Sequence, residues 1–375
     1  MASILRNSTG VPQAASVDEM LVDESAFDLH RYVDALAGLT PLTVTVALPA
    51  DIRSSLLEVY PVLYKAYFLA IRTFEDLTRP ETPFTRPAMS WLDLPGLPPS
   101  IELLKVWAAT LDFGVERFRA SGCFPRLSSR SPKDSLALRR RADAASSSDT
   151  EQSGCLCRSG LEVVELLATS ERVFADLGRA ASTESPSFVL LRAWADMPPE
   201  NEFRAFVLDG KVTAISQYAT QATLPALQAP GPRARVVAAM ARFIVQAVLP
   251  RLPCEPYHAA CVVDLSWSAA GLARAAGAPA DVALEESRAD VPAGLSVVEL
   301  NPFCRRTGAG MFSWRDDWAV LSGSPDRRVD CGASRGDDGL RDPLPTESAM
   351  EPATGSGLVF RYRSAVAGEA GESRY

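Results

Sequence analysis

Histidine and long hydrophobic runs are nearly absent from this sequence, and each absence excludes a class of function. The 375 residues include only 2 histidines, His30 and His258, which argues against a histidine-based triad and against a zinc site. No apolar run approaches the roughly 20 residues that span a bilayer, so we expect no membrane partner. The first residues also lack a long apolar core, which argues against a secretory signal.

An excess of positive charge is absent as well, because the sequence has 38 Lys and Arg but 46 Asp and Glu, which gives a net charge of −8. This balance argues against nucleic acid as a partner of the whole molecule. The seven cysteines are scattered and odd in number, which fits a reducing compartment, and we expect a cytoplasmic monomer. We expect the one close pair, Cys155 and Cys157, to be thiols of a mobile loop.

The sequence does contain one long stretch with the composition of a folded domain, residues 21–322. Residues 1–20 are polar, and residues 323–375 are rich in Gly, Ser, Asp, Arg and Pro, so we expect both to be mostly disordered. Within the domain, charged or Ala/Gly/Pro-rich stretches predict flexible insertions near 138–157 and 269–294.

The spacing of apolar residues predicts a mixture of helices and antiparallel strands. Helices are expected over 26–36, 54–77 with an interruption at Pro61, 100–121 with Ser100 as N-cap, 161–180 with a break at Thr169-Ser170, and 233–252. Strands are expected over 42–49, 188–194, 261–267, 295–303 and 358–363, and over 202–218 as a hairpin that turns at Asp209-Gly210. This pattern predicts an α+β fold rather than a doubly wound parallel sheet.

Two of the expected strands carry acidic residues where their apolar runs end, at Asp264 and at Glu299-Leu300-Asn301. Glu299 and Asn301 are two residues apart, so their side chains leave the same face of a strand. If Asp264 lies on the neighbouring strand with the same facing, three oxygen ligands converge, as a magnesium ion requires. The alternative is two ordinary strands whose polar positions face solvent.

Arginines and hydroxyls upstream are suited to phosphate. Arg126 lies in a short segment with Ser128 and Ser129, where guanidinium, hydroxyl and backbone amide groups could bind phosphate oxygens. Arg204 lies on a strand of the hairpin and, pointed into a cleft, would bind a phosphate bidentately. Arg192, Ala193 and Trp194 end a buried strand, whose backbone could bind an adenine edge.

Five segments in this order resemble the signature segments of the cell division cycle protein 123 family: FPRLSSRSPKD, FVLLRAW, ENEFRAFVLDGKVTAISQY, CVVDLSW and VVELNPFCRRTGAGMFSW. The resemblance covers roughly residues 120–318. It implies an ATP-grasp-like fold, in which two α+β subdomains hold the nucleotide between them. It also implies Mg²⁺ and ATP as ligands.

Carried over by position, the resemblance assigns metal ligands, phosphate contacts and adenine contacts. Asp264, Glu299 and Asn301 would bind magnesium. The nucleotide site as a whole would consist of Arg126, Ser128, Ser129, Arg192, Ala193, Trp194, Glu202, Arg204, Gln217, Asp264, Glu299 and Asn301. Several features depart from the family: Arg126 replaces a Lys, Glu299 replaces an Asp, and CRRTGAG replaces an acidic, hydroxyl-rich stretch. The insertion at 269–294 and the N-terminal part also differ.

The resemblance implies an ATP-dependent chaperone that assembles translation initiation factor 2 by binding its gamma subunit. Whether ATP is hydrolysed stays open, since that family is not an established group of ligases. The alternative is an ATP-grasp ligase or phosphotransferase that acts on an unknown acidic substrate, because Arg305 and Arg306 of the altered loop could bind an anion. A scaffold that binds no nucleotide is a third hypothesis.

Overall fold

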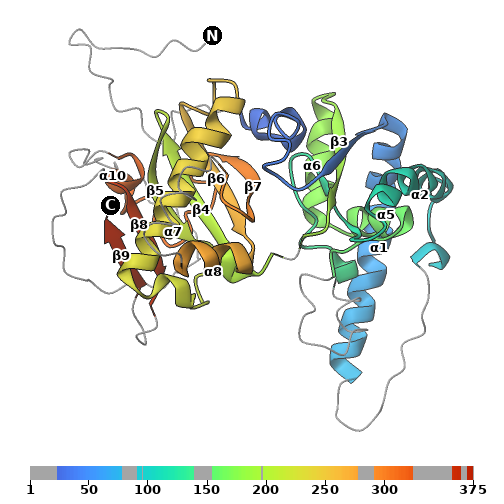
Figure 1. Cartoon of the computed structure of the whole chain (residues 1–375). Coiled ribbons are helices and arrows are strands. Elements are labelled where there is room, and N and C mark those ends of the chain that lie inside the picture. Colours follow the sequence, from blue (N-terminus) through green and yellow to red (C-terminus); the bar gives the residue numbers. More distant parts are fainter. Residues whose placement is uncertain are drawn as a thin grey trace. The chain divides into compact units, whose positions relative to one another are not determined.

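The computed structural model describes residues 23–77, 91–94, 96–138, 154–195, 197–277, 291–323, 357–364 and 370–374. The chain forms two compact units (Figure 1). The three-stranded unit contains Asp28–Val33 and Pro41–Ala195, and the six-stranded unit contains Asp34–Thr40, the chain from Asp196 onward and the described residues up to Phe27. Each unit combines helices with a sheet, so the α+β prediction is confirmed.

The sheet of the three-stranded unit is antiparallel, with strand order β1-β3-β2. Its strands are β1 (Thr43–Leu48), β2 (Cys123–Leu127) and β3 (Ser187–Ala193). The alternation of β-branched residues correctly predicted β1 and β3. Since β3 is the central strand, Val189, Leu190 and Leu191 are fully buried.

Helices surround this sheet and form the core with it. They are α1 (Ala50–Leu77), α2 (Ile101–Val115), α5 (Gly160–Ala168) and α6 (Glu171–Ser182), with short 3-10 turns η2 (Leu29–Arg31), η3 (Trp91–Asp93) and η4 (Glu116–Phe118). The predicted break at 169–170 is confirmed, because the Ser170 hydroxyl accepts from Val173 N–H at 3.2 Å and begins α6. No described helix is long and apolar enough to cross a membrane.

Two helix signals act differently from the prediction. Helix α1 continues through Pro61, because Val59 and Leu63 on either side are fully buried while Pro61 lies on the exposed side. Ser100 has helical backbone angles and no capping bond from its side chain. The first amides of α2 donate instead to the carbonyls of Pro98, Pro99 and Ser100.

The six-stranded unit has strand order β7-β6-β4-β5-β8-β9, in which only β5 and β8 pair in parallel. Its strands are β4 (Glu202–Leu208), β5 (Lys211–Gln217), β6 (Ala260–Trp267), β7 (Leu295–Pro302), β8 (Val359–Arg363) and β9 (Ala370–Arg374). The hairpin prediction for β4 and β5 is confirmed. Asp209 and Gly210 both have positive φ, 49° and 71°, as a two-residue hairpin turn requires.

Different elements cover the two faces of this sheet. Helices α7 (Pro230–Arg242), η7 (Phe243–Val248, a π-helix) and α8 (Ala269–Gly277) cover one face (Figure 1). Phe206 packs from the other face into an aromatic cluster with Phe303, Phe312, Trp314 and Trp318, whose rings meet mostly edge to face. The remaining short helices are η1 (Glu24–Phe27), η5 (Pro199–Asn201), η6 (Pro225–Leu227), η8 (Leu249–Arg251) and α10 (Trp318–Leu321).

Several predicted loops and helices need correction. The expected helix over 26–36 is two 3-10 turns, because tertiary bonds take its backbone: Ala26 O accepts from the Tyr257 hydroxyl, and Leu29 N–H donates to Ser128 O. The expected insertion at 269–294 begins with a helix, α8, while residues 278–290 lie outside the described residues. Cys155 and Cys157 are free thiols, as expected, but they are buried rather than part of a mobile loop, and Cys157 exchanges two backbone hydrogen bonds with Cys123.

The chain termini were expected to be mostly disordered. Residues 1–20, 324–356 and 365–369 lie outside the described residues. The short strand expected at 358–363 is confirmed as β8. Strand β9, which pairs with β8 along the sheet edge, was not predicted.

Candidate functional site

Strand register in the six-stranded unit places charged residues in a row across the sheet. Arg204 on β4 lies opposite Asp264 on β6, and Asp264 lies opposite Glu299 on β7. Residues that face each other across antiparallel strands project from the same face. Asn301, two residues beyond Glu299, lies opposite Val262 on that face. The register therefore brings together four of the residues that the sequence singled out, here named the acid–arginine cluster.

Asp264 is the centre of the acid–arginine cluster. Arg204 Nε donates to Asp264 Oδ1 at 2.8 Å and Arg204 Nη2 donates to Oδ2 at 2.7 Å, so the pair is bidentate. Asn301 Nδ2 donates to Asp264 Oδ2 at 3.0 Å. The side chains of Arg204 and Asp264 are only 8% and 7% exposed. A charged carboxylate is thus held in one orientation within the sheet face.

Arg204 is held by two further groups. Its Nη1 donates to the carbonyl of Gly308, and its guanidinium lies 4.9 Å from the centroid of the exposed Tyr218 ring. Burial alone would lower the pKa of Arg204, but the hydrogen bond and the charge of Asp264 outweigh burial and raise it. Arg204 therefore stays protonated, and it is fixed by Asp264, Gly308 and Tyr218.

The donor chemistry of the acid–arginine cluster fits a magnesium ion that keeps several non-protein ligands. Asp264 and Glu299 supply carboxylate oxygens, and Asn301 supplies an amide oxygen. Among the described residues there is no group of three or more His, Cys, Asp and Glu placed to hold a metal. Mg²⁺ is usually bound through one or two carboxylates together with water and substrate phosphates, so it does not require such a group.

One feature of the cluster would have to change on metal binding. Asn301 presents its nitrogen to Asp264, while a metal would need its oxygen. Turning the amide by half a rotation would satisfy that requirement. Both Asp264 oxygens also accept from Arg204, and Oδ2 accepts from Asn301 as well, so the Asn301 nitrogen would have to leave Oδ2 before this oxygen could bind a cation.

Two other predicted residues of this unit, Glu202 and Gln217, lie on opposite faces of the sheet. Glu202 is two residues before Arg204 on β4, half-buried, and lies on the same face. Gln217 lies opposite Phe203, so its position is on the face away from Arg204. Its side chain is fully buried, and Nε2 donates to the carbonyl of Ala222 at 2.7 Å. The structure therefore places Glu202, but not Gln217, on the face of the acid–arginine cluster.

The other six predicted residues belong to the three-stranded unit. Arg126 is on β2, and its Nε donates to the neighbouring Leu127 carbonyl at 3.0 Å, which uses one of its five N–H donors. Ser128 follows the strand and is buried; its hydroxyl accepts from His30 N–H at 2.9 Å and lies 2.6 Å from His30 Nδ1. A His30 ring with no proton on Nδ1 accepts a hydrogen bond from the Ser128 hydroxyl, and one protonated there donates to it. This hydroxyl is therefore committed to His30.

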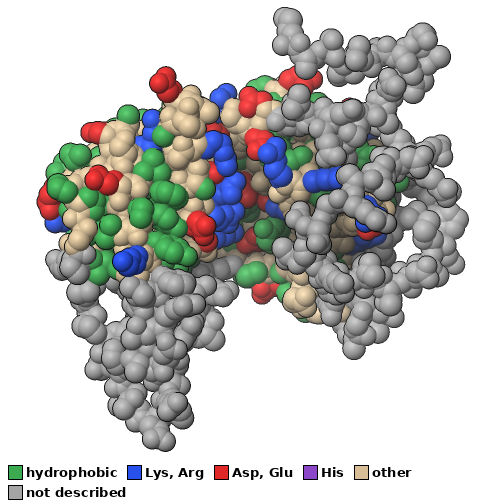
Figure 2. Space-filling model, turned by 180° about the vertical axis from the view of Figure 1, so that it is seen from behind, with side chains coloured by type: hydrophobic (Ala, Val, Ile, Leu, Met, Phe, Trp, Pro, Cys, Tyr) green, Lys and Arg blue, Asp and Glu red, His purple; other side chains and the backbone are tan. Residues whose placement is uncertain are grey.

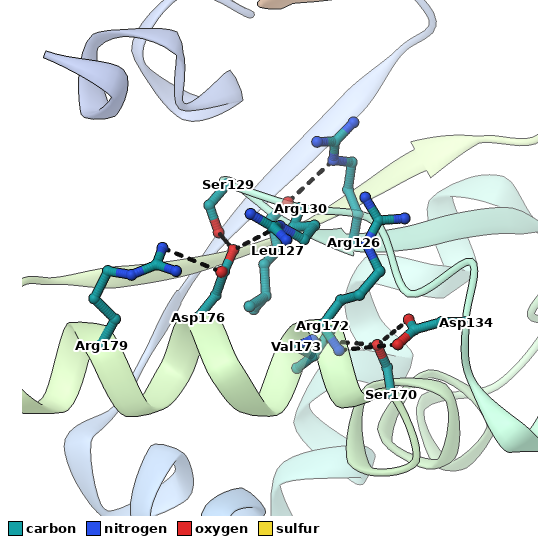
Figure 3. A network of polar contacts seen from close by, with 10 residues as sticks. All are labelled: Arg126, Leu127, Ser129, Arg130, Asp134, Ser170, Arg172, Val173, Asp176 and Arg179. Carbon is teal, nitrogen blue, oxygen red and sulfur yellow. Dashed lines mark hydrogen bonds and ion pairs between the residues drawn. The ribbon is translucent and has the colours of Figure 1, made fainter. Parts of the chain in front are cut away.

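The Ser129 hydroxyl is committed in a similar way. It donates to Asp176 Oδ2 at 2.8 Å, and the same carboxylate pairs with Arg130 Nε and Arg179 Nη1, both at 3.3 Å (Figure 3). Asp176 is buried on α6, so it orients the loop that follows β2. The two serine hydroxyls of this loop already have partners, so its guanidinium and backbone N–H groups are the ones suited to bind an anion.

A local basic surface surrounds this loop despite the net negative charge of the chain. Arg172 and Arg179 are exposed on α6, and the Arg130 side chain is 41% exposed. Lys and Arg side chains also gather in a band on the face of the molecule that Figure 2 shows. The carboxylates of Asp134 and of the buried Asp176 offset part of this charge, so the surface attracts anions without being uniformly positive.

Arg192 and Ala193 form the end of β3, and Trp194 follows the strand directly. The N–H groups of Ala193 and Trp194 donate to the carbonyls of Leu42 and Gly122, at 2.7 Å and 3.0 Å. Both amides are therefore used within the sheet. The predicted contact with an adenine edge would fall to carbonyl groups of this stretch, which can accept from an exocyclic amine.

Sequence reasoning missed His30, Asp176 and Tyr218. No local pattern points to His30 or Asp176, because their partners are 98 and 47 residues away. Tyr218 directly follows β5, and the alternation of apolar residues predicted where this strand ends. The one signal in the sequence that could have singled out Tyr218 was therefore an aromatic residue at a strand end.

Comparison with known proteins identifies relatives. The family model described as D123 matches residues 119–328. Two solved structures, Cdc123 from Schizosaccharomyces pombe and a C-terminally truncated form of it, are each 16% identical to this chain, with TM-scores of 0.49 and 0.50. Each comparison covers 80% of this chain and 93% of the other chain, and at this identity the likeness concerns the fold alone. No curated protein matches the sequence.

Proposed function

Because the chain belongs to the D123 family, we propose that it binds Mg²⁺-ATP and acts as an assembly factor for translation initiation factor 2. The acid–arginine cluster carries the nucleotide part of this proposal. The signature segments shared with the cell division cycle protein 123 family are the reason for naming the gamma subunit as partner. The same resemblance supports an ATP-grasp-like arrangement, and the scattered cysteines support a cytoplasmic location.

The contacts in the six-stranded unit support a role for each residue of the acid–arginine cluster. Asp264 and Glu299 would hold the metal through carboxylate oxygens, and Asn301 through its amide oxygen. When bound, Mg²⁺ would neutralise charge on the phosphates of ATP. Arg204 holds the Asp264 carboxylate in one orientation through two hydrogen bonds, and it would place a second positive group beside the phosphates.

The three-stranded unit would contribute two separate elements. Arg126 and Arg130, with the backbone amides of their loop, would bind phosphate oxygens, while Asp176 keeps the loop in one conformation. The carbonyls near Ala193 would accept from the adenine amine. Binding energy rather than bond cleavage would be the output, with the nucleotide favouring the conformation that binds the partner.

Thermal unfolding with nucleotide tests this function. ATP at about 100 times its Kd should stabilise the native protein by about 2.7 kcal/mol, and only when Mg²⁺ is present. Glu299→Gln removes one metal-binding charge from a half-buried position and should abolish most of this stabilisation. Asp209→Asn, a matched change at the exposed hairpin turn, should leave it intact. Equal stabilisation of both variants would refute the metal site.

Binding to the partner needs its own experiment. Purified gamma subunit of translation initiation factor 2 should bind the full chain, and more tightly with Mg²⁺-ATP than with EDTA, because the nucleotide selects one conformation. The Glu299→Gln variant should show no such enhancement. Failure of the wild-type chain to bind this subunit under any condition would remove the assembly role and leave nucleotide binding untouched.

An enzymatic role is a second candidate, and the loop after β7 favours it. Arg305 and Arg306 are exposed there, in the loop that begins two residues beyond Asn301. Two guanidinium groups at this place could bind an acidic substrate. Purified protein that converts ATP to ADP in the presence of a carboxylate substrate would support a ligase or phosphotransferase. An absence of turnover over a panel of acids and amines would refute it.

A further inference from the structure

Strand β8 lies beyond the stretch that the D123 model matches, yet it extends the same sheet. It pairs with β5 so that Arg361 lies opposite Ser216, and Ser216 lies opposite Arg204. Arg361 thus continues the row of residues that contains the acid–arginine cluster. A residue from beyond the expected domain is placed two strands from Arg204.

Both faces of β8 are anchored. On one face, the Tyr362 hydroxyl accepts from Arg233 Nη1 at 2.7 Å, and the Arg233 guanidinium lies 4.5 Å from the Tyr362 ring centroid. On the other face, Arg361 Nη1 and Nη2 donate to the two oxygens of Asp317, both at 2.7 Å. The Arg361 and Asp317 side chains are 18% and 14% exposed, so the pair is largely shielded from water.

Arg361 also holds the segment 307–317, which follows β7. Its Nη1 donates to the Met311 carbonyl at 3.2 Å, and its guanidinium lies 4.6 Å from the Phe312 ring centroid. Asp317, held by Arg361, accepts from Ser313 N–H at 2.7 Å. These bonds fix the second half of the segment against β8.

The first half of the same segment touches the acid–arginine cluster. The Gly308 carbonyl accepts from Arg204 Nη1, and Met311 N–H donates to the Ser216 hydroxyl at 2.8 Å. Gly310 has φ of +64°, and a Cβ there would meet Ser216 Oγ at 2.6 Å, so the segment lies directly on the sheet. A continuous set of contacts therefore runs from Arg361 through Met311 and Gly308 to Arg204.

We propose that Arg361 is a positioning residue of the magnesium–phosphate site: it holds segment 307–317 so that the Gly308 carbonyl fixes Arg204, and Arg204 in turn fixes Asp264. This inference rests on the proposed binding of Mg²⁺-ATP. Without Arg361, Arg204 loses the fixed carbonyl on one side. The orientation of Asp264 then becomes less well defined, which weakens metal and nucleotide binding.

The test compares Arg361→Met with Tyr362→Phe in the full chain. Both changes remove an anchor of β8 and lower the unfolding temperature, but only Arg361 is connected to the cluster. Calorimetric titration with Mg²⁺-ATP, below the unfolding temperature of both variants, should show binding about tenfold weaker or more for Arg361→Met, as is typical when a residue supporting a metal ligand is lost. Tyr362→Phe should bind as the wild type does.

Two additional measurements keep the test decisive. If Arg361→Met does not fold, Asp317→Asn removes the same ion pair with a smaller change and should weaken binding in the same direction. Amide exchange of the peptide around Met311 should be faster in either variant and unchanged in Tyr362→Phe. If the wild type binds Mg²⁺-ATP and neither Arg361→Met nor Asp317→Asn weakens this binding, the inference about Arg361 is overturned while the proposed function stands. Wild-type protein that does not bind Mg²⁺-ATP would overturn the proposed function, and the inference with it.

Discussion

Replacing Asp264 by Asn removes the negative charge from the buried pair with Arg204 while preserving the shape of the side chain. Arg204 then keeps its positive charge inside the sheet face, where both side chains are less than a tenth exposed. Breaking a buried ion pair by removing one partner typically costs about 3–5 kcal/mol. The amide oxygen of the introduced asparagine would still accept one hydrogen bond from Arg204, which returns about 1 kcal/mol. We therefore expect a net loss of about 2–4 kcal/mol in the free energy of unfolding.

This loss should be visible in thermal unfolding. A unit of about 150–250 residues loses roughly 2–4 °C in unfolding temperature per kcal/mol, so the midpoint should fall by about 9 °C. The double variant Asp264→Leu with Arg204→Met replaces the pair by apolar groups and should be more stable than the sum of its single variants predicts.

Two outcomes would refute this reasoning about the ion pair. A midpoint for Asp264→Asn within about 1 °C of the wild type would mean that the pair contributes little to the folded state. Strictly additive losses in the double variant would mean that Arg204 and Asp264 do not interact as their 2.7 and 2.8 Å contacts indicate.

Two further predictions concern the three-stranded unit. Burial, and then the charge of Arg31, hold the pKa of His30 below its ordinary 6.5, so the stability that neutral His30 contributes is present above pH 6.5 and is lost as pH falls through the lowered value. Unfolding temperatures measured from about pH 5 to 8 should therefore fall less steeply toward acid for His30→Asn, and parallel curves would contradict this. A Cβ on Gly160 would meet the Ala108 carbonyl oxygen at 1.9 Å, whereas one on Gly178 meets nothing within 4 Å. Gly160→Ala should therefore disturb the packing of α2 on α5 and lower the free energy of unfolding by about 1–3 kcal/mol. Gly178→Ala in helix α6 should raise the free energy of unfolding by about 0.5–1 kcal/mol. Denaturant titrations measure both, and equal effects would be evidence against the close contact between α2 and α5.

Where the controlling interactions are local, the sequence predicted the structure well. The β4–β5 hairpin turns at Asp209-Gly210, because these residue types accept positive φ and few others do. The break between α5 and α6 occurs at Ser170, whose hydroxyl caps the helix through the nearby N–H of Val173. Helix α1 was one exception, since burial on both sides of Pro61 outweighed the one hydrogen bond that proline removes. The other was Ser100, whose side chain does not cap α2.

In the candidate site, too, local features could be predicted and long-range contacts could not. The spacing of Glu299 and Asn301 predicted a shared face, which follows from strand geometry alone. The roles of the serines could not be predicted, because Ser128 and Ser129 are bound by side chains 98 and 47 residues away. The ion pair between Arg361 and Asp317 could not be predicted either, because the two residues are 44 positions apart and the stretch between them has no recognisable pattern.

Residue order alone thus determined most of the segments that become strands, although not β2 or β9, and which polar residues they present. It could do so because alternation, turn chemistry and capping act over a few residues. Strand order and register were decided by the tertiary structure, since any strand can form backbone hydrogen bonds with any other. That register aligned Arg361, Ser216, Arg204, Asp264 and Glu299 across five strands. It turned separate polar residues into one connected set of charges and hydrogen bonds, in which the position of each side chain depends on its neighbours.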